Sequence, residues 1–381
     1  MAIGNSGNLT IKDSDLERVK RRIGKPYPAD PSFTTMTDDV IRRFALYCVA
    51  TENPLFSNNE YGAGTSFKSI IAAPCTGYVA LSGGQRGTGL PGIFALHATD
   101  EWLFQKPIFP GDVIRSTRCL TSVTEKVSKW GGRAIHQTFE HLIRNQNQEL
   151  TTTYRTLVIR AERTKATASK KYESIEPYRY SQKEMESIYR DYEAEAIRGA
   201  RPRYWEEVTE GESVGQVVKG PLTVSDIICW WMGAGAPLLF PFKLRYLQFQ
   251  KRPGLGIVDP ETNISHSPES AHFDRELAKR SGLGAPYDTG RQRSCWFAHL
   301  ATNWMGDAAW LKELRGTFLT PNYVGDTTWI RGNVVEKFTQ DGEFLVKIAM
   351  KAETQRGHCH STGEAIVSLP SSTRESVTKG S

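Results

Sequence analysis

The feature that most constrains the fold is an approximate internal duplication. Residues 106–115 read KPIFPGDVIR and residues 320–329 read TPNYVGDTTW, so each copy has a proline followed four residues later by Gly-Asp. Gly-Asp after a proline indicates a turn, and the β-branched residues that follow alternate as they do in a strand. The echoes lie about 190–215 residues apart, which is too far for a solenoid repeat and predicts two copies of one domain.

A second pair of similar segments lies upstream of each turn. TMTDDVIRRFALYCVA (35–50) and LTVSDIICWWMGAGA (222–236) both place Thr or Ser and Asp before an apolar helical pattern. This arrangement is typical of a helix start. Each half is therefore predicted to contain a helix start, a loop, an apolar helix, the Gly-Asp turn and then several strands.

The middle of each half holds its strongest apolar helix candidate. These candidates are residues 75–84 in the first half and residues 290–306 in the second. In the second, Trp296, Leu300 and Trp304 recur every four residues and predict one buried face. Strands are predicted to follow at residues 327–338, 343–354 and 364–370. The predicted fold class is α+β, with two antiparallel sheets that each wrap around a central apolar helix.

The chain between the halves has a different composition. Residues 161–203 are rich in charge and poor in apolar side chains, which favours a partly helical linker on the surface. We therefore predict an N-terminal domain at 1–165, a charged linker at 166–200 and a C-terminal domain at 201–381. A length of 381 residues accommodates two such domains.

Composition excludes several classes of function. No apolar run reaches the length of a membrane span, and the N-terminus lacks the apolar core of a signal peptide. Six scattered cysteines without a CxxC pair favour reduced thiols, so we expect a cytoplasmic protein that does not bind membranes. The net charge of +6 comes from interleaved basic and acidic residues, which argues against nucleic acid as a partner.

Two short motifs are read as structural. GTGLPG (87–92) has the GxGxxG form, but Pro91 would stand where a nucleotide-binding helix begins, so a turn is the better interpretation. His358 and His360 would share one face of a strand without a third ligand nearby in sequence, so no metal site is predicted.

His272 is the residue with the strongest case for chemistry. It is followed by Asp274, a short helix, Pro286 and then Gly290, which opens the long apolar helix. Unpaired N–H groups at a helix start can bind a carbonyl oxygen that gains negative charge. A histidine near such a site can act as a general base on water, although a structural role for His272 is the competing interpretation.

The spacing of these residues resembles that of the MaoC-like (R)-specific enoyl-CoA hydratases and dehydratases. Their motif is Asp-x-Asn-Pro-x-His-x-Asp, followed by a short helix and Pro-x-x-His-Gly. His272-Phe273-Asp274 matches His-x-Asp, and Pro286 and Gly290 follow fourteen and eighteen residues after His272. Gly-Asp-Thr at 325–327 matches the turn that opens a strand in this family. The matches extend over most of residues 10–165 and 201–370.

The resemblance implies a double hotdog fold with one catalytic half. In the first half, ENPLFSNNEY (52–61) matches the motif with Phe56 in place of its His and Asn58 in place of its Asp. The first half therefore lacks the base, and any active site is expected in the second half. The first half would contribute shape and part of the acyl-CoA cleft.

The second half also departs from the family motif. Ser267 stands where the family has its catalytic Asp, inside an enlarged loop at 259–272. The acid is therefore expected from Glu269, Glu261 or Asp259, and His266 is a candidate helper. A rival alignment on Glu261, Asn263 and His266 fails downstream, because no Asp follows His266 by two residues.

The resemblance implies reversible hydration of a 2-enoyl-CoA to a 3-hydroxyacyl-CoA. The Gly290 N–H would bind the thioester oxygen, assisted by the polar Thr289 that replaces the family His, while His272 and a carboxylate would handle water. Further candidate substrate-binding residues are Asp274, Asp288, Arg291 and Arg293, the two arginines toward CoA phosphates, although a solvated face explains the arginines equally well. CoA would be part of the substrate, so no separate cofactor is expected.

Three alternatives remain open from the sequence. The same fold hosts acyl-CoA thioesterases, for which Asp288 or Glu269 would activate water. The missing Asp is also consistent with a non-catalytic acyl-CoA binding or partner subunit, and a lyase acting on a free acid is the third alternative. A homodimer is compatible with two fused hotdogs, although no residue indicates it.

Overall fold

The computed structural model defines most of the chain. The described residues are 10–29, 34–81, 89–90, 93–127, 132–162, 175–235, 239–252, 256–280 and 283–373. The GTGLPG segment lies largely outside these residues.

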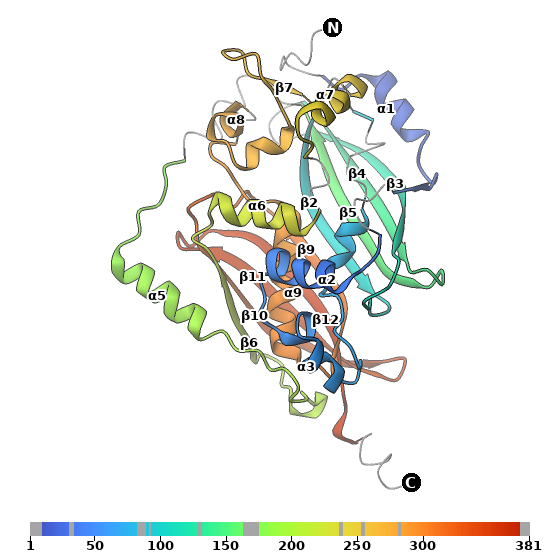
Figure 1. Ribbon diagram of the computed structural model, residues 1–381, viewed down its shortest axis with the longest axis vertical. Helices are drawn as coiled ribbons and strands as arrows, with labels where there is room; N and C mark the ends of the chain where they lie inside the picture. The colour runs from blue at the N-terminus through green and yellow to red at the C-terminus, as the bar shows by residue number, and fades with distance from the viewer. Residues whose placement is uncertain are drawn as a thin grey trace.

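One antiparallel sheet of ten strands runs through both halves of the chain (Figure 1). Its strand order is β1-β3-β4-β5-β2-β9-β12-β11-β10-β6. The strands are β1 (Tyr27–Pro28), β2 (Phe94–Phe104), β3 (Arg115–Val127), β4 (Arg133–Arg144), β5 (Leu150–Ala161), β6 (Ser213–Lys219), β9 (Trp310–Phe318), β10 (Thr328–Gln340), β11 (Glu343–Thr354) and β12 (Cys359–Leu369). The predicted strands of the second half are confirmed.

The prediction of two separate sheets is corrected by the pairing of β2 with β9. Thr99–Leu103 of β2 run antiparallel to Glu313–Thr317 of β9. Each strand is the inner edge of its own half, and an unpaired edge presents a row of free N–H and C=O groups. Pairing the two edges satisfies these groups and joins the halves into one sheet.

The duplication is confirmed by matching backbone hydrogen bonds. Gly111 N–H donates to the Met36 carbonyl, and Met36 N–H donates to the Asp112 carbonyl. In the second half, Gly325 N–H donates to the Leu222 carbonyl, and Leu222 N–H donates to that of Asp326. Both glycines have a positive φ, 91° and 96°, which explains why the turn uses glycine.

The predicted helix starts are confirmed as well. Thr37 caps α2 (Asp38–Phe44), which continues as a short π-helix, η1 (Ala45–Val49). Thr223 and Asp226 form a capping box at α6 (Val224–Gly233). The other helices are α1 (Asp13–Lys20), η2 (Pro54–Phe56), α3 (Asn59–Gly64), α5 (Gln182–Glu193), η4 (Trp205–Glu207), α7 (Phe242–Lys251), η6 (Pro268–His272) and α8 (Arg275–Arg280). A small hairpin of β7 (Ile257–Val258) and β8 (Ser265–His266) precedes η6.

The central helix differs between the halves. In the second half it is the predicted α9 (Gly290–Met305), which packs along β9, β6 and β12. In the first half, only a 3₁₀ helix, η3 (Thr76–Ala80), lies within the predicted helix at 75–84, and residues 82–84 fall outside the described ones. Cys75, which precedes η3, has a left-handed φ of 68°, whereas Thr289, which precedes α9, is extended.

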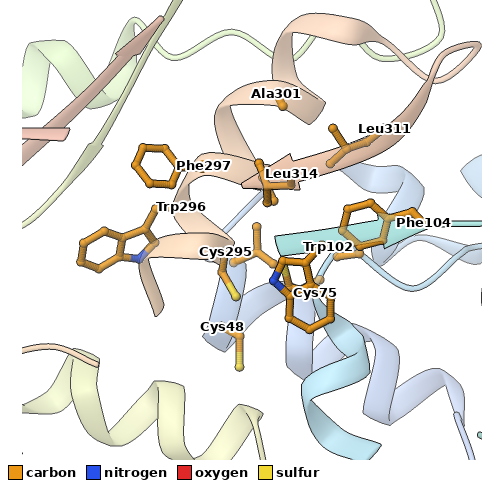
Figure 2. Packing of buried hydrophobic residues seen from close by; sticks show 14 of the residues in the cluster. Cys48, Cys75, Trp102, Phe104, Cys295, Trp296, Phe297, Ala301, Leu311 and Leu314 are labelled. Carbon is orange, nitrogen blue, oxygen red and sulfur yellow. The ribbon is translucent and has the colours of Figure 1, made fainter. Parts of the chain in front are cut away.

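The core extends across both halves. Figure 2 shows Cys295 and Trp296 of α9 in the same cluster as Cys75, Trp102 and Phe104 of the first half. Each of these side chains is buried. Because apolar burial is the main favourable term in folding, the two halves stabilise one another. Helix α5 lies inside the predicted linker, and its Asp191 accepts a hydrogen bond from Trp329 Nε1 at 2.8 Å.

Candidate active site

His272 lies at the end of η6, next to Glu269. Its Nε2 is 3.6 Å from Glu269 Oε2, and its Nδ1 lies 2.8 Å from the Tyr287 carbonyl. A carbonyl only accepts, so Nδ1 carries the hydrogen and, in the neutral ring, Nε2 keeps a lone pair toward Glu269. The ring also packs against Tyr287, with 4.2 Å between centroids. These contacts fix an orientation in which His272 can accept a proton at Nε2.

Glu269 is a largely buried carboxyl group, with 18% of its side chain exposed. Burial raises its pKa above the usual 4.5, while the positive charge of Arg291 and a protonated His272 partly oppose that rise. A raised carboxyl pKa brings the group closer to neutral pH, where an acid works most effectively. Glu269 is therefore suited to hold and release a proton beside His272.

The other candidate acids lie on the preceding hairpin. Asp259 pairs with Arg280 at 3.3 Å and accepts hydrogen bonds from the N–H groups of Glu261 and Thr262. Glu261 is exposed, and His266 belongs to β8. Among the carboxylates that the sequence singled out, Glu269 is the one that lies beside His272, at 3.6 Å.

Asp288 and Arg293, which the sequence offered as substrate-binding residues, bind each other instead. Asp288 and Arg293 form a bidentate pair, with distances of 2.6 and 2.7 Å, and both are buried. Arg293 also donates to the carbonyls of Thr320 and His360. These contacts anchor the first turn of α9 and favour a structural role over contact with CoA phosphates.

Asp274 and Thr289 have capping contacts. The Asp274 carboxylate accepts from the Leu277 N–H at 2.9 Å, at the start of α8. The Thr289 hydroxyl accepts from the Gln292 N–H at 3.3 Å, at the start of α9. Each cap satisfies a backbone donor that has no partner inside its helix.

Gly290, the first residue of α9, leaves little room for a side chain. A Cβ atom placed on it would lie 3.1 Å from the Phe318 ring and 3.4 Å from Cβ and Cγ of His97. His97 belongs to β2 of the first half. The predicted oxyanion position therefore lies where the two halves of the chain meet.

Asp100, which the sequence did not single out, organises a buried polar cluster beside this helix start. It has no exposed surface and accepts hydrogen bonds from Tyr78, Tyr154 and Ser294 at 2.5, 2.6 and 2.8 Å. His97 Nε2 lies 2.5 Å from Oδ1, the carboxylate oxygen that also accepts from Tyr154. Although burial raises the pKa of Asp100, its contacts with His97 and the two tyrosines outweigh burial and lower the pKa to about 2. Asp100 is therefore ionised at neutral pH.

A β-bulge explains why this pair was missed. Residues three apart in a regular strand point to opposite faces, so His97 and Asp100 gave no signal in the sequence. The register of β2 against β5 shifts between His97 and Thr99, which inserts Ala98 as an extra residue. The bulge turns both side chains to the same face.

Arg291 interacts electrostatically with both the Asp100 cluster and Glu269. It is partly buried, and its guanidinium lies 5.5 Å from the centroid of the Tyr78 ring. Burial lowers its pKa, but the nearby Tyr154, Tyr78, Asp100 and Glu269 outweigh burial and raise it. A permanent positive charge thus lies within electrostatic reach of both Asp100 and Glu269.

The corresponding region of the first half is an apolar cavity. About 540 Å³ of space, part of it open to solvent, is bordered by Leu55, Phe56, Gly77, Phe104, Met305 and Trp310. Phe56 occupies the motif position that would hold a histidine, and it is 2% exposed. The motif position in this cavity therefore carries an apolar ring in place of an acid–base group.

Across the described ranges, no three histidine, cysteine or acidic side chains are grouped so that they could bind a metal ion. None of the helices in the described part of the chain combines the length and apolar character of a membrane span.

Comparison with known proteins gives a family match and a shared fold. Residues 21–153 match the family described as FAS1-like, dehydratase domain region. A solved MaoC-like dehydratase aligns with 93% of this chain and 100% of its own, with a TM-score of 0.65 and 16% identity. No curated protein matches the chain in sequence.

Two other solved structures have the same architecture. A putative MaoC domain protein dehydratase from Chloroflexus aurantiacus covers 92% of this chain and 96% of its own, with a TM-score of 0.56 and 13% identity. A Mycobacterium tuberculosis protein described as a double hotdog covers 91% and 96%, with a TM-score of 0.57 and 10% identity. The chain therefore has the double hotdog fold of these structures, and the family match covers a dehydratase domain region within its first half.

Proposed function

We propose that the protein catalyses the reversible hydration of a 2-enoyl-CoA to a 3-hydroxyacyl-CoA. The observation that carries the proposal is the His272–Glu269 pair at 3.6 Å, positioned by Tyr287 close to the start of α9. Hydration needs one group that removes a proton from water and one that delivers a proton to C2. A histidine with a free lone pair and a carboxyl with a raised pKa meet these two requirements.

The steps follow from the positions of these groups. In the proposed reaction, His272 Nε2 and Glu269 together bind one water molecule, and His272 takes its proton as the water oxygen forms a bond to C3. The C2–C3 π electrons move toward the thioester oxygen, which the N–H groups at the start of α9 stabilise. Protonated Glu269 then gives its proton to C2, and His272 returns a proton to Glu269. The reaction needs no separate cofactor, because the CoA thioester itself accepts the charge.

The first test is to incubate purified protein with crotonyl-CoA and with bulkier aryl and branched enoyl-CoAs. Loss of the absorbance of the conjugated thioester is the expected result. Release of free thiol would instead identify a thioesterase. Tight CoA binding with neither change would identify a non-catalytic acyl-CoA binding subunit.

Variants of the pair test the assigned roles. His272→Ala and Glu269→Gln are each expected to lower kcat by about 10²- to 10⁴-fold, the usual contribution of a general acid or base. The matched control is His136→Ala, which removes a partly exposed histidine on β4. Full activity in His272→Ala would refute the site assignment.

A further inference from the structure

We propose that His97 of the first half is a second hydrogen-bond donor to the thioester oxygen, next to the Gly290 N–H, and that Asp100 positions it. The inference depends on the proposed function for the identity of its ligand, an acyl-CoA thioester. It assigns a catalytic residue to the first half of the chain, in which Phe56 and Asn58 replace the His and Asp of the motif.

The first support is the position of His97. Its Cβ and Cγ lie 3.4 Å from the point that a Cβ on Gly290 would occupy, so the ring borders the first turn of α9. The side chain is 20% exposed, whereas Asp100 behind it is fully buried. His97 therefore keeps accessible surface beside the first turn of α9, whereas the Asp100 carboxylate has none.

The second support is the orientation of the ring. Nε2 is held by Asp100 Oδ1 at 2.5 Å and lies 3.0 Å from Thr156 Oγ1. Among the described residues, no hydrogen bond is recorded to Nδ1 of His97. Phe318 packs edge-on against the ring, with 5.2 Å between centroids. A histidine fixed at one nitrogen by a buried carboxylate presents its other nitrogen in a defined direction.

The third support is the charge balance of the cluster. Asp100 is fully buried and accepts four hydrogen bonds, so its negative charge is fixed in place. When His97 carries both ring hydrogens, its positive charge is balanced by Asp100, and Nδ1–H becomes a charge-assisted donor. Such a donor is needed where negative charge develops on the thioester oxygen.

A binding experiment tests this role without requiring turnover. Acetoacetyl-CoA forms an enolate that absorbs more strongly than its keto form, so a preorganised oxyanion site increases that absorbance at fixed pH. Wild type and His136→Ala are expected to give the enolate signal, His97→Ala to lose most of it, and His97→Gln to retain part of it. The amide of Gln is neutral but still able to donate.

Kinetics with crotonyl-CoA provides the second readout. His97→Ala is expected to lower kcat on the order of 100-fold with little change in KM, because an oxyanion donor acts in the transition state. Asp100→Asn is expected to lower kcat in the same direction, and a thermal melt checks that each variant is folded. Because His97 is partly exposed and Asp100 is fully buried, the His97 variants are the ones expected to keep the fold.

The outcomes separate the two proposals. An enolate signal in wild type that disappears in His97→Ala supports the donor role, even if crotonyl-CoA is not hydrated and the proposed function fails. Active wild type whose kcat and enolate signal are unchanged in His97→Ala overturns the donor role and leaves the hydratase proposal intact. Absence of the enolate signal in wild type also overturns the donor role.

Discussion

At the scale of single residues, the site depends on which carboxylate lies close to His272. Ser267 replaces the acid of the family motif, yet Glu269 lies within 3.6 Å of the histidine. The reason is local, because residues 268–272 form a 3₁₀ helix, in which side chains three residues apart lie on the same side. An acid at position 269 can therefore pair with His272 in place of an acid at position 267.

Asp100 leads to a prediction about stability and pH. Its pKa is about 2 in the folded protein and 3.8 in its ordinary state, so the unfolded chain binds more protons between these values. The stabilisation from ionised Asp100 is complete above pH 3.8 and is lost as pH falls through 2. The difference corresponds to about 2 kcal/mol. Urea unfolding of wild type and Asp100→Asn between pH 5 and 2 measures it, and parallel pH dependences would contradict the prediction.

At the scale of elements, α9 is the part that brings the site together. Its N-cap and its first turn are anchored by Thr289 and by the Asp288–Arg293 pair. Arg291 and Ser294, three residues apart, face the buried cluster around Asp100. The helix thus orders polar groups from both halves along one side of its first turn.

Gly290→Ala tests this arrangement. Alanine is a good helix former, but its methyl group would lie 3.1 Å from Phe318 and 3.4 Å from His97, so these side chains must move. We expect kcat to fall at least about tenfold, because a small displacement at a reacting centre is costly. The free energy of unfolding should change by no more than about 1–3 kcal/mol. A crotonyl-CoA assay alongside a urea titration checks both, and unchanged kcat would show that the first turn tolerates the methyl group.

At the scale of the whole molecule, the two halves share one sheet and one core. The sheet is continuous through β2 and β9, and the main core cluster draws on both halves. Lys219 Nζ donates to the carbonyls of Val49 and Ala50 at 3.1 Å each, and Tyr61 donates to Asp307 at 2.5 Å. Neither half can be removed without exposing apolar surface and an unpaired strand edge.

This continuity predicts cooperative unfolding. Far-ultraviolet circular dichroism and tryptophan fluorescence should report the same midpoint in urea, because the tryptophans occur in both halves and share the core. Separate midpoints would show that the halves unfold independently. The homodimer and the absence of a separate cofactor, both expected from the sequence, remain predictions.

The sequence alone was sufficient for features that depend on local chemistry. Capping residues predicted the starts of α2 and α6, Gly111 and Gly325 predicted matching turns, and apolar periodicity predicted α9. The resemblance to the family placed the motif around His272. These features are readable because caps, positive φ values and helical periodicity each require particular residue types at fixed spacing.

The tertiary structure alone decided how distant residues meet. The bulge at Ala98 turns His97 and Asp100 to one face, and the β2–β9 pairing carries that face to the start of α9. The structure also committed Asp288 to Arg293 and placed Glu269 against His272. A bulge, an edge pairing and a buried ion pair depend on which surfaces pack together, and that information is not carried by the spacing of residues along the chain.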